Sequence, residues 1–177
     1  MENDFLFFKD YIKKACERID DHYFQLTVAN TKNRIYRERV YCYELYHQLR
    51  CMLGENYPYK LYGEIDKSGH PNRFIGEGAK KPDFIFHEPG NMNRNLVIME
   101  IKNINRRGIL VEIKNDLRKI KTFINKAKYF KGIMLIYGSD NSDLTKEIVK
   151  TIKNHSCNKI LVLWHKSPLT PPEEISL

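Results

Sequence analysis

Hydrophobic residues along the chain follow two periods, and the change from one to the other outlines the fold. Apolar positions recur every three or four residues in four segments, which predicts helices at about 5–26, 35–53, 110–128 and 142–153. Short alternating or continuously apolar runs predict five strands, at 59–65, 83–87, 96–102, 132–137 and 159–164. Glycine and proline residues separate these segments, as expected for turns.

The order of the elements predicts a mixed α/β fold. A meander of three strands followed by alternating helices and strands gives a mixed central β-sheet with helices on both faces. We therefore expect one domain over 31–166, an extra N-terminal helix within 1–30, and a flexible tail over 167–177. The apolar face of the first helix suggests that it either caps the domain or forms a homodimer.

Charge and cysteine content narrow the class of protein. The 177 residues include 30 Lys and Arg against 22 Asp and Glu, a net charge of +8, which favours a polyanionic partner. The four cysteines form no C-x-x-C pair, which indicates free thiols in a reducing compartment. No signal peptide or membrane-spanning run is apparent, so we expect a soluble cytoplasmic protein with no membrane partner.

Two charged residues stand inside the apolar strand 96–102. Glu100 and Lys102 are two positions apart, so their side chains share one face of the strand. Burial of either charge costs several kcal/mol unless it is paired or binds a metal. A structural ion pair and a functional site are both consistent with this pattern.

The preceding strand adds a second carboxylate. If the strands at 83–87 and 96–102 pair in antiparallel fashion across their short turn, Asp83 lies beside Glu100. Two close carboxylates repel, so either one is protonated or a cation lies between them, and a hard divalent ion prefers oxygen ligands. Such an ion activates water for attack on phosphate, and a lysine at the rim orients the water or stabilises negative charge.

These residues resemble the motif of the PD-(D/E)XK nuclease superfamily. Pro82-Asp83 is followed, after sixteen residues, by Glu100-Ile101-Lys102. The resemblance implies a restriction-endonuclease-like core and a metal-dependent endonuclease that hydrolyses phosphodiester bonds, with DNA favoured over RNA. It further implies that Asp83, Glu100 and the carbonyl oxygen of Ile101 bind Mg²⁺ or Mn²⁺, and that Lys102 positions or activates the water.

Members of this family often add a glutamate from the helix before the sheet, and the chain offers two candidates. Glu38 shares a helix stripe with Cys42 and Leu45 and should point toward the sheet. Glu44 is turned about 120° away by helix geometry. We favour Glu38 and keep Glu44 as the alternative.

Basic and amide side chains near these positions suggest where a nucleic acid lies. They precede Asp83, follow Lys102, or form a stripe on the helix 110–128, where the alternative is a charged solvent-facing surface. The candidates are Lys80, Lys81, Asn103, Asn105, Arg106, Arg107, Lys114, Arg118 and Lys121. The loop 69–78 is long for a hairpin and suggests a segment that contacts substrate.

Three functions are consistent with the sequence. A metal-dependent nuclease is favoured by the motif, and a non-catalytic nucleic-acid-binding module fits the composition equally well. A protein-interaction module that docks through its first helix is the third. The chain shows no separate recognition domain, which argues against cutting at a specific base sequence.

Overall fold

The computed structural model describes residues 1–55, 57–64, 81–139 and 142–176. The described helices are α1 (Glu2–Cys16), α2 (Asp21–Phe24), α3 (Glu38–Leu53), the short 3-10 helix η1 (Met92–Arg94), α4 (Ile109–Lys126) and α5 (Ser142–His155). The described strands are β1 (Leu26–Thr27), β2 (Arg34–Ile35), β3 (Lys60–Gly63), β4 (Phe84–His87), β5 (Asn95–Asn103), β6 (Lys131–Tyr137), β7 (Ile160–His165) and β8 (Glu173–Glu174). The loop 69–78 and Lys80 lie outside the described residues.

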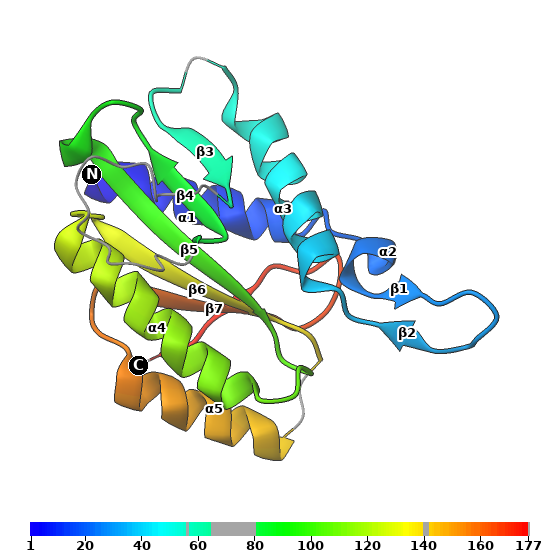
Figure 1. Ribbon diagram of the computed structural model, residues 1–177. Coiled ribbons are helices and arrows are strands. Elements are labelled where there is room, and N and C mark those ends of the chain that lie inside the picture. Colours follow the sequence, from blue (N-terminus) through cyan, green and yellow to red (C-terminus); the bar gives the residue numbers. More distant parts are fainter. Residues whose placement is uncertain (56, 65–80, 140–141, 177) are drawn as a thin grey trace.

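A six-stranded mixed sheet in the order β3-β4-β5-β6-β7-β8 forms the centre of the fold (Figure 1). β3, β4 and β5 are antiparallel neighbours, β5, β6 and β7 run parallel, and β8 closes the far edge in antiparallel orientation. The meander and the helical crossovers predicted from the sequence account for this change of strand direction. The predicted mixed α/β class is confirmed.

Helices cover both faces of the sheet. α1 and α3 pack on one face, where Phe8, Leu45 and Met99 belong to the same buried cluster. α4 and α5 cover the other face, where Ile120 and Ile152 belong to a second cluster. Every residue of β5 is buried, which is why its sequence is a nearly continuous apolar run.

The first predicted helix is shorter in the structure than its apolar period suggested. α1 ends at Cys16, and the separate helix α2 begins after Asp20. The Asp20 side chain accepts a hydrogen bond from the backbone N–H of His22 at 2.8 Å, as a helix N-cap does. The prediction of one continuous helix over 5–26 was therefore wrong beyond Cys16, because a local cap competes with helix continuation.

The C-terminal segment, for which the prolines suggested a flexible tail, contributes a strand. In β8, Glu174 lies opposite Leu163 and Glu173 opposite Trp164. Glu174 also forms ion pairs with Lys9 and Lys13 of α1, at 3.1 and 2.6 Å. Proline ends a helix or an inner strand but is compatible with an edge strand, so Pro172 permits this pairing.

The apolar face of α1 is buried within the chain. Phe8 is fully buried and its ring stacks on the ring of Phe86 in β4, with centroids 4.0 Å apart. Ile12 and Ala15 of the same face are also fully buried. The surface on which the homodimer hypothesis rested is thus not exposed, and α1 caps the sheet of its own chain.

The structure also bears on the predictions about cysteines and membrane spans. All four cysteines are free thiols. Within the described ranges, no helix combines the length and the apolar composition that a bilayer span requires.

Candidate functional site

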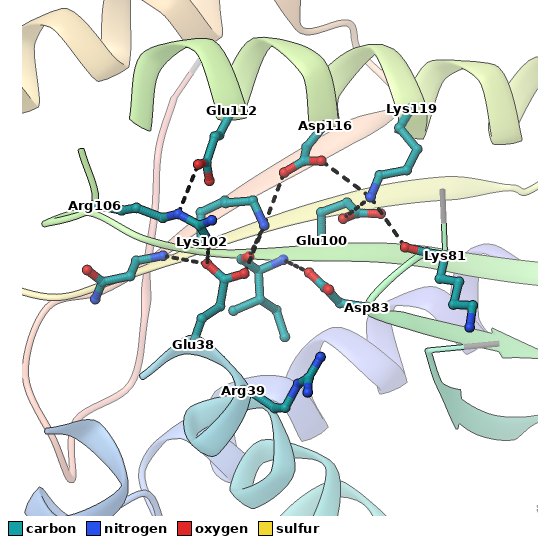
Figure 2. Close-up of polar contacts among 12 residues, drawn as sticks. Glu38, Arg39, Lys81, Asp83, Glu100, Lys102, Arg106, Glu112, Asp116 and Lys119 are labelled. Carbon is teal, nitrogen blue, oxygen red and sulfur yellow. Dashed lines mark hydrogen bonds and ion pairs between the residues drawn. The ribbon is translucent and has the colours of Figure 1, made fainter. Parts of the chain in front are cut away.

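The pairing of β4 with β5 brings two acidic residues together. Phe84 lies opposite Met99, so one step further along this register Asp83 stands opposite Glu100. Figure 2 shows both side chains near the middle of the sheet, beneath α4. The sequence predicted this juxtaposition from the short turn between the strands, and the antiparallel register accounts for it.

Asp83 is anchored to the backbone of the neighbouring strand. Its Oδ2 accepts a hydrogen bond from the N–H of Ile101 at 2.7 Å. Burial raises the pKa of this carboxyl, while the nearby Lys102 ammonium and the Ile101 N–H act in the opposite direction. The hydrogen bond fixes the orientation of Asp83 toward the end of β5.

Glu100 is fully buried and only half satisfied. Lys119 of α4 donates to Glu100 Oε2 at 2.6 Å, whereas Oε1 has no hydrogen-bond partner among the described residues. Burial raises the pKa of Glu100 well above its usual value, and repulsion from Asp83 raises it further. An unpaired buried carboxylate oxygen is costly, so this atom is a site where a cation would be stabilised.

Lys102 is held among acceptors from three elements. Its Nζ donates to Glu38 Oε1 at 3.1 Å and to the Ile101 carbonyl at 2.8 Å, and lies 3.2 Å from Asp116 Oδ2. Burial alone would lower the pKa of Lys102, but the surrounding carboxylates, Asp83 foremost, raise it above its ordinary value. The side chain is therefore a fixed ammonium ion at neutral pH.

Of the two helix glutamates, Glu38 is the one that joins this network. It is the first residue of α3, and its Oε2 accepts from the N–H of Asn103 at 3.4 Å and lies 3.7 Å from Arg106 Nη1. Glu44 instead accepts a hydrogen bond from Gln48 on its own helix at 2.7 Å. The helical spacing argument thus selected the glutamate that contacts Lys102.

Sequence reasoning missed two members of the network, Asp116 and Lys119. Lys119 Nζ lies 3.3 Å from Asp116 Oδ1, and both side chains are largely buried between α4 and the sheet. A signal was present, because Asp116 follows Ile113 by three residues and precedes Ile120 by four, which places a carboxylate on the apolar stripe.

The predicted arginines lie beside the network. Arg106 donates through Nε to Glu112 Oε1 at 2.9 Å in addition to its contact with Glu38 (Figure 2). Arg107 is exposed next to it, in the loop between β5 and α4. The guanidinium of Arg106 is therefore partly neutralised, whereas Arg107 faces solvent.

The remaining predicted nucleic-acid contacts lie in three places. Lys81 is exposed before β4, where its carbonyl oxygen accepts from Lys119 at 3.4 Å. Asn103 accepts from the N–H of Asn105 at 2.9 Å, so these two amides order the loop after β5. On α4, exposed or half-buried side chains form the predicted basic stripe of Lys114, Arg118 and Lys121.

The oxygen atoms of Asp83, Glu100 and Ile101 are the candidate ligands for a divalent cation. No group of three or more His, Cys, Asp or Glu side chains in the described ranges is arranged to hold a metal ion. Asp83, the unpaired Oε1 of Glu100 and the Ile101 carbonyl nevertheless supply hard oxygen ligands close together. The Ile101 carbonyl also accepts from the Lys102 ammonium, so a divalent ion here would have few protein ligands and would keep several waters, as Mg²⁺ does.

Comparisons with models of protein families, with curated proteins and with solved structures found no match for the chain.

Proposed function

We propose that this protein is a metal-dependent nuclease that hydrolyses phosphodiester bonds on a restriction-endonuclease-like core. The observation that carries the proposal is that Asp83 and Glu100 are opposite each other in the β4–β5 register, with Lys102 two residues further along β5. Among the described residues, the buried Oε1 of Glu100 has no hydrogen-bond partner. The net charge of +8 is consistent with a polyanionic substrate. The preference for DNA over RNA and the cytoplasmic location rest on the sequence arguments alone.

In this proposal Asp83, Glu100 and the carbonyl oxygen of Ile101 would hold Mg²⁺ or Mn²⁺. When bound, the ion would lower the pKa of a water molecule and polarise a phosphate oxygen. Lys102 would stabilise negative charge on the phosphate as a fixed cation, because its raised pKa makes it a poor proton acceptor. To orient the attacking water it would exchange one of its three present acceptors for that water. Glu38 keeps the Lys102 ammonium in position.

The test is cleavage of labelled single- and double-stranded DNA and RNA with Mg²⁺, Mn²⁺ or a chelator. We expect cleavage that requires the metal and falls by at least about 100-fold in Asp83→Asn, Glu100→Gln and Lys102→Met. The matched control is Glu147→Gln, which removes an exposed carboxylate from α5. Full activity of folded Asp83→Asn with Mg²⁺ present would reject the assignment of the site.

A second candidate is a nucleic-acid-binding module that does not cut, and one observation favours it. Lys119 already pairs with Glu100 at 2.6 Å, so the chain itself supplies a cation where the nuclease proposal places a metal ion. Titration with Mg²⁺, followed by thermal unfolding, distinguishes the two functions. If the protein is a nuclease, millimolar Mg²⁺ should raise the unfolding temperature of the parent protein but not that of Glu100→Gln. If it is a binding module without a metal site, Mg²⁺ should change the unfolding temperature of neither protein.

A further inference from the structure

A pocket of about 290 Å³ lies between α3 and the edge of the sheet formed by β3 and β4. It shares Asp83 with the candidate site and is otherwise lined by residues that the mechanism above does not use. These are Cys42, Tyr43, Tyr46, Gly63, Glu64 and Phe84. The pocket is small for a drug-sized ligand and suits a single aromatic ring system.

Aromatic rings form two walls of this pocket. The Tyr46 hydroxyl donates to the carbonyl of Leu61 at 3.2 Å, and its ring lies 5.8 Å from the ring of Phe84, so this part is rigid. Tyr43, one turn earlier on α3, is 61% exposed, so its ring is accessible to a ligand. A planar ligand that enters the pocket would cover Tyr43 by stacking.

Carboxylates supply the polar groups of the lining. Glu64 follows β3 and is largely exposed, and its Oε1 lies 3.6 Å from Nε of Arg39 at the rim. Asp83 is held by the N–H of Ile101. Carboxylates accept hydrogen bonds from the exocyclic amino groups of adenine, cytosine and guanine, and Arg39 offers a cation for a phosphate.

The pocket continues directly from the candidate site along one stripe of α3. Glu38, which contacts Lys102, is followed at intervals of four residues by Cys42 and Tyr46, which line the pocket. One helical turn rises about 5.4 Å, so the two sites are neighbours on the scale of one nucleotide. A strand whose phosphate lies at Asp83 therefore has its adjacent base at the mouth of the pocket.

We propose that this pocket binds one unstacked nucleobase of the strand whose phosphate lies at Asp83. The proposal rests on the proposed function and specifies its substrate class, a nucleic acid that is single-stranded or has an unpaired base next to the scissile phosphate. A base in a blunt duplex is stacked and paired, so it cannot reach the pocket without the cost of flipping.

The experiment measures binding separately from cutting. A short single-stranded DNA with one 2-aminopurine, whose fluorescence is quenched by stacking, is titrated with the full chain at low salt in Ca²⁺, with parallel samples in EDTA. We expect quenching, and affinity about tenfold higher for the single strand than for the same sequence in a blunt duplex. Free 2-aminopurine nucleotide should bind at least tenfold more weakly than the strand, and equal affinity would overturn the assignment to a strand.

Two variants remove the pocket in different ways. Tyr43→Ala deletes a stacking wall, and Gly63→Val fills the space, since a Cβ at Gly63 meets its nearest neighbours at an ordinary 3.6 Å. Each should weaken single-strand binding about tenfold and reduce quenching. Tyr43→Phe should retain both, as should Tyr23→Ala, which removes an exposed tyrosine on α2.

The outcomes separate this proposal from the nuclease assignment. Unchanged quenching and strand preference in both Tyr43→Ala and Gly63→Val would overturn the base pocket, even if Mg²⁺-dependent cleavage is found. Loss of quenching in these variants without any cleavage by the parent protein would support the pocket and reject the nuclease.

Discussion

Lys119 and Glu100 show how single residues determine the character of the candidate site. Their 2.6 Å contact is largely withdrawn from solvent, and Asp116 shares the same ammonium group. Removal of one partner from a buried ion pair leaves a charge without compensation, which costs more than the pair contributes. The site therefore depends on a residue that belongs to no recognised motif.

We predict that Lys119→Met lowers the free energy of unfolding by about 3–5 kcal/mol. The physical reason is that Glu100 and Asp116 lose their shared cation while they remain buried. Urea titration measures the effect, with Lys121→Met on the outer part of α4 as a control that should change stability by less than about 0.5 kcal/mol. Equal stability of the two variants would contradict the structural role of Lys119.

Glu38 and Glu44 offer a matched pair on one helix. Glu38→Gln should reduce cleavage about 10- to 100-fold, because the amide holds the Lys102 ammonium less firmly than the carboxylate does. Glu44→Gln should leave cleavage unchanged, since Glu44 is bonded to Gln48. The measurement is single-turnover cleavage at saturating metal, and the reverse order of effects would refute the choice of Glu38.

We predict that the buried His165 makes the protein less stable as the pH falls below neutral. Burial lowers its pKa to about 4, and Nδ1 lies 2.8 Å from the hydroxyl of the buried Tyr41. The unfolded chain takes up a proton near pH 6.5 and the folded chain only near pH 4, so stability falls as the pH drops through this window, by roughly 3 kcal/mol in total. Urea unfolding between pH 7 and pH 4 measures the slope.

The matched variants for this prediction are His165→Gln and His22→Gln. The slope should become shallower in His165→Gln, because the buried titrating group is gone. It should persist in His22→Gln, which replaces an exposed histidine on α2. An unchanged slope in His165→Gln would show that other groups cause the acid sensitivity.

At the scale of elements, the close packing of α4 on β6 depends on a residue without a side chain. A Cβ added at Gly132 would lie 2.1 Å from Cγ2 of Ile120, a distance that forces the helix away from the strand. The parallel strands β5 and β6 carry the candidate site and the core beneath α4. The distance between helix and sheet, which sets the Lys119–Glu100 contact, is therefore limited by Gly132.

Gly132→Ala should destabilise the protein by about 1–3 kcal/mol through overpacking. Gly63→Ala is the control, because its added methyl meets neighbours at 3.6 Å and should change stability little. Thermal unfolding of both variants tests the difference. A stable Gly132→Ala protein would mean that α4 can shift without cost.

On the scale of the whole molecule, the N-terminal helix completes the core instead of extending from it. α1 lies across the sheet face shared with α3 (Figure 1), and its lysines bind the edge strand β8 through Glu174. The two ends of the chain are thus tied together over one face of the sheet. We therefore expect substitutions in the buried side of α1 to lower the stability of the whole domain.

Phe8→Ala should lower the free energy of unfolding by about 3–5 kcal/mol, because it opens a cavity against the stacked ring of Phe86. The neighbouring Leu6→Ala is the control, since Leu6 is 47% exposed. Urea unfolding and sedimentation of both variants test this. If Phe8→Ala were fully stable and changed the solution mass, α1 would instead form a contact between two copies of the chain.

The sequence by itself located the longer elements and singled out Asp83, Glu100, Lys102 and Glu38 as candidate residues, but it did not predict α2, β1, β2 or β8. Periods of 3.6 and 2 located α3, α4, α5 and the strands β3 to β7, because a partly buried surface must repeat with the geometry of its element. The spacing from Asp83 to Glu100 allowed their meeting, but the register that places them opposite each other, with its shift between Phe86 and His87, is a feature of the structure. Gly54, one of the glycines that separate the predicted segments, ends α3 with a positive φ of 65°.

Only the tertiary structure decided which residues from different helices and strands are in contact. The strand β8 and the contact of Lys119 with Glu100 depend on segments far apart in the chain. Local patterns carry no record of such distances, because a charged residue on a helix looks the same whether it meets solvent or a buried carboxylate. Lys119 became part of the site only when α4 packed on the sheet above Glu100.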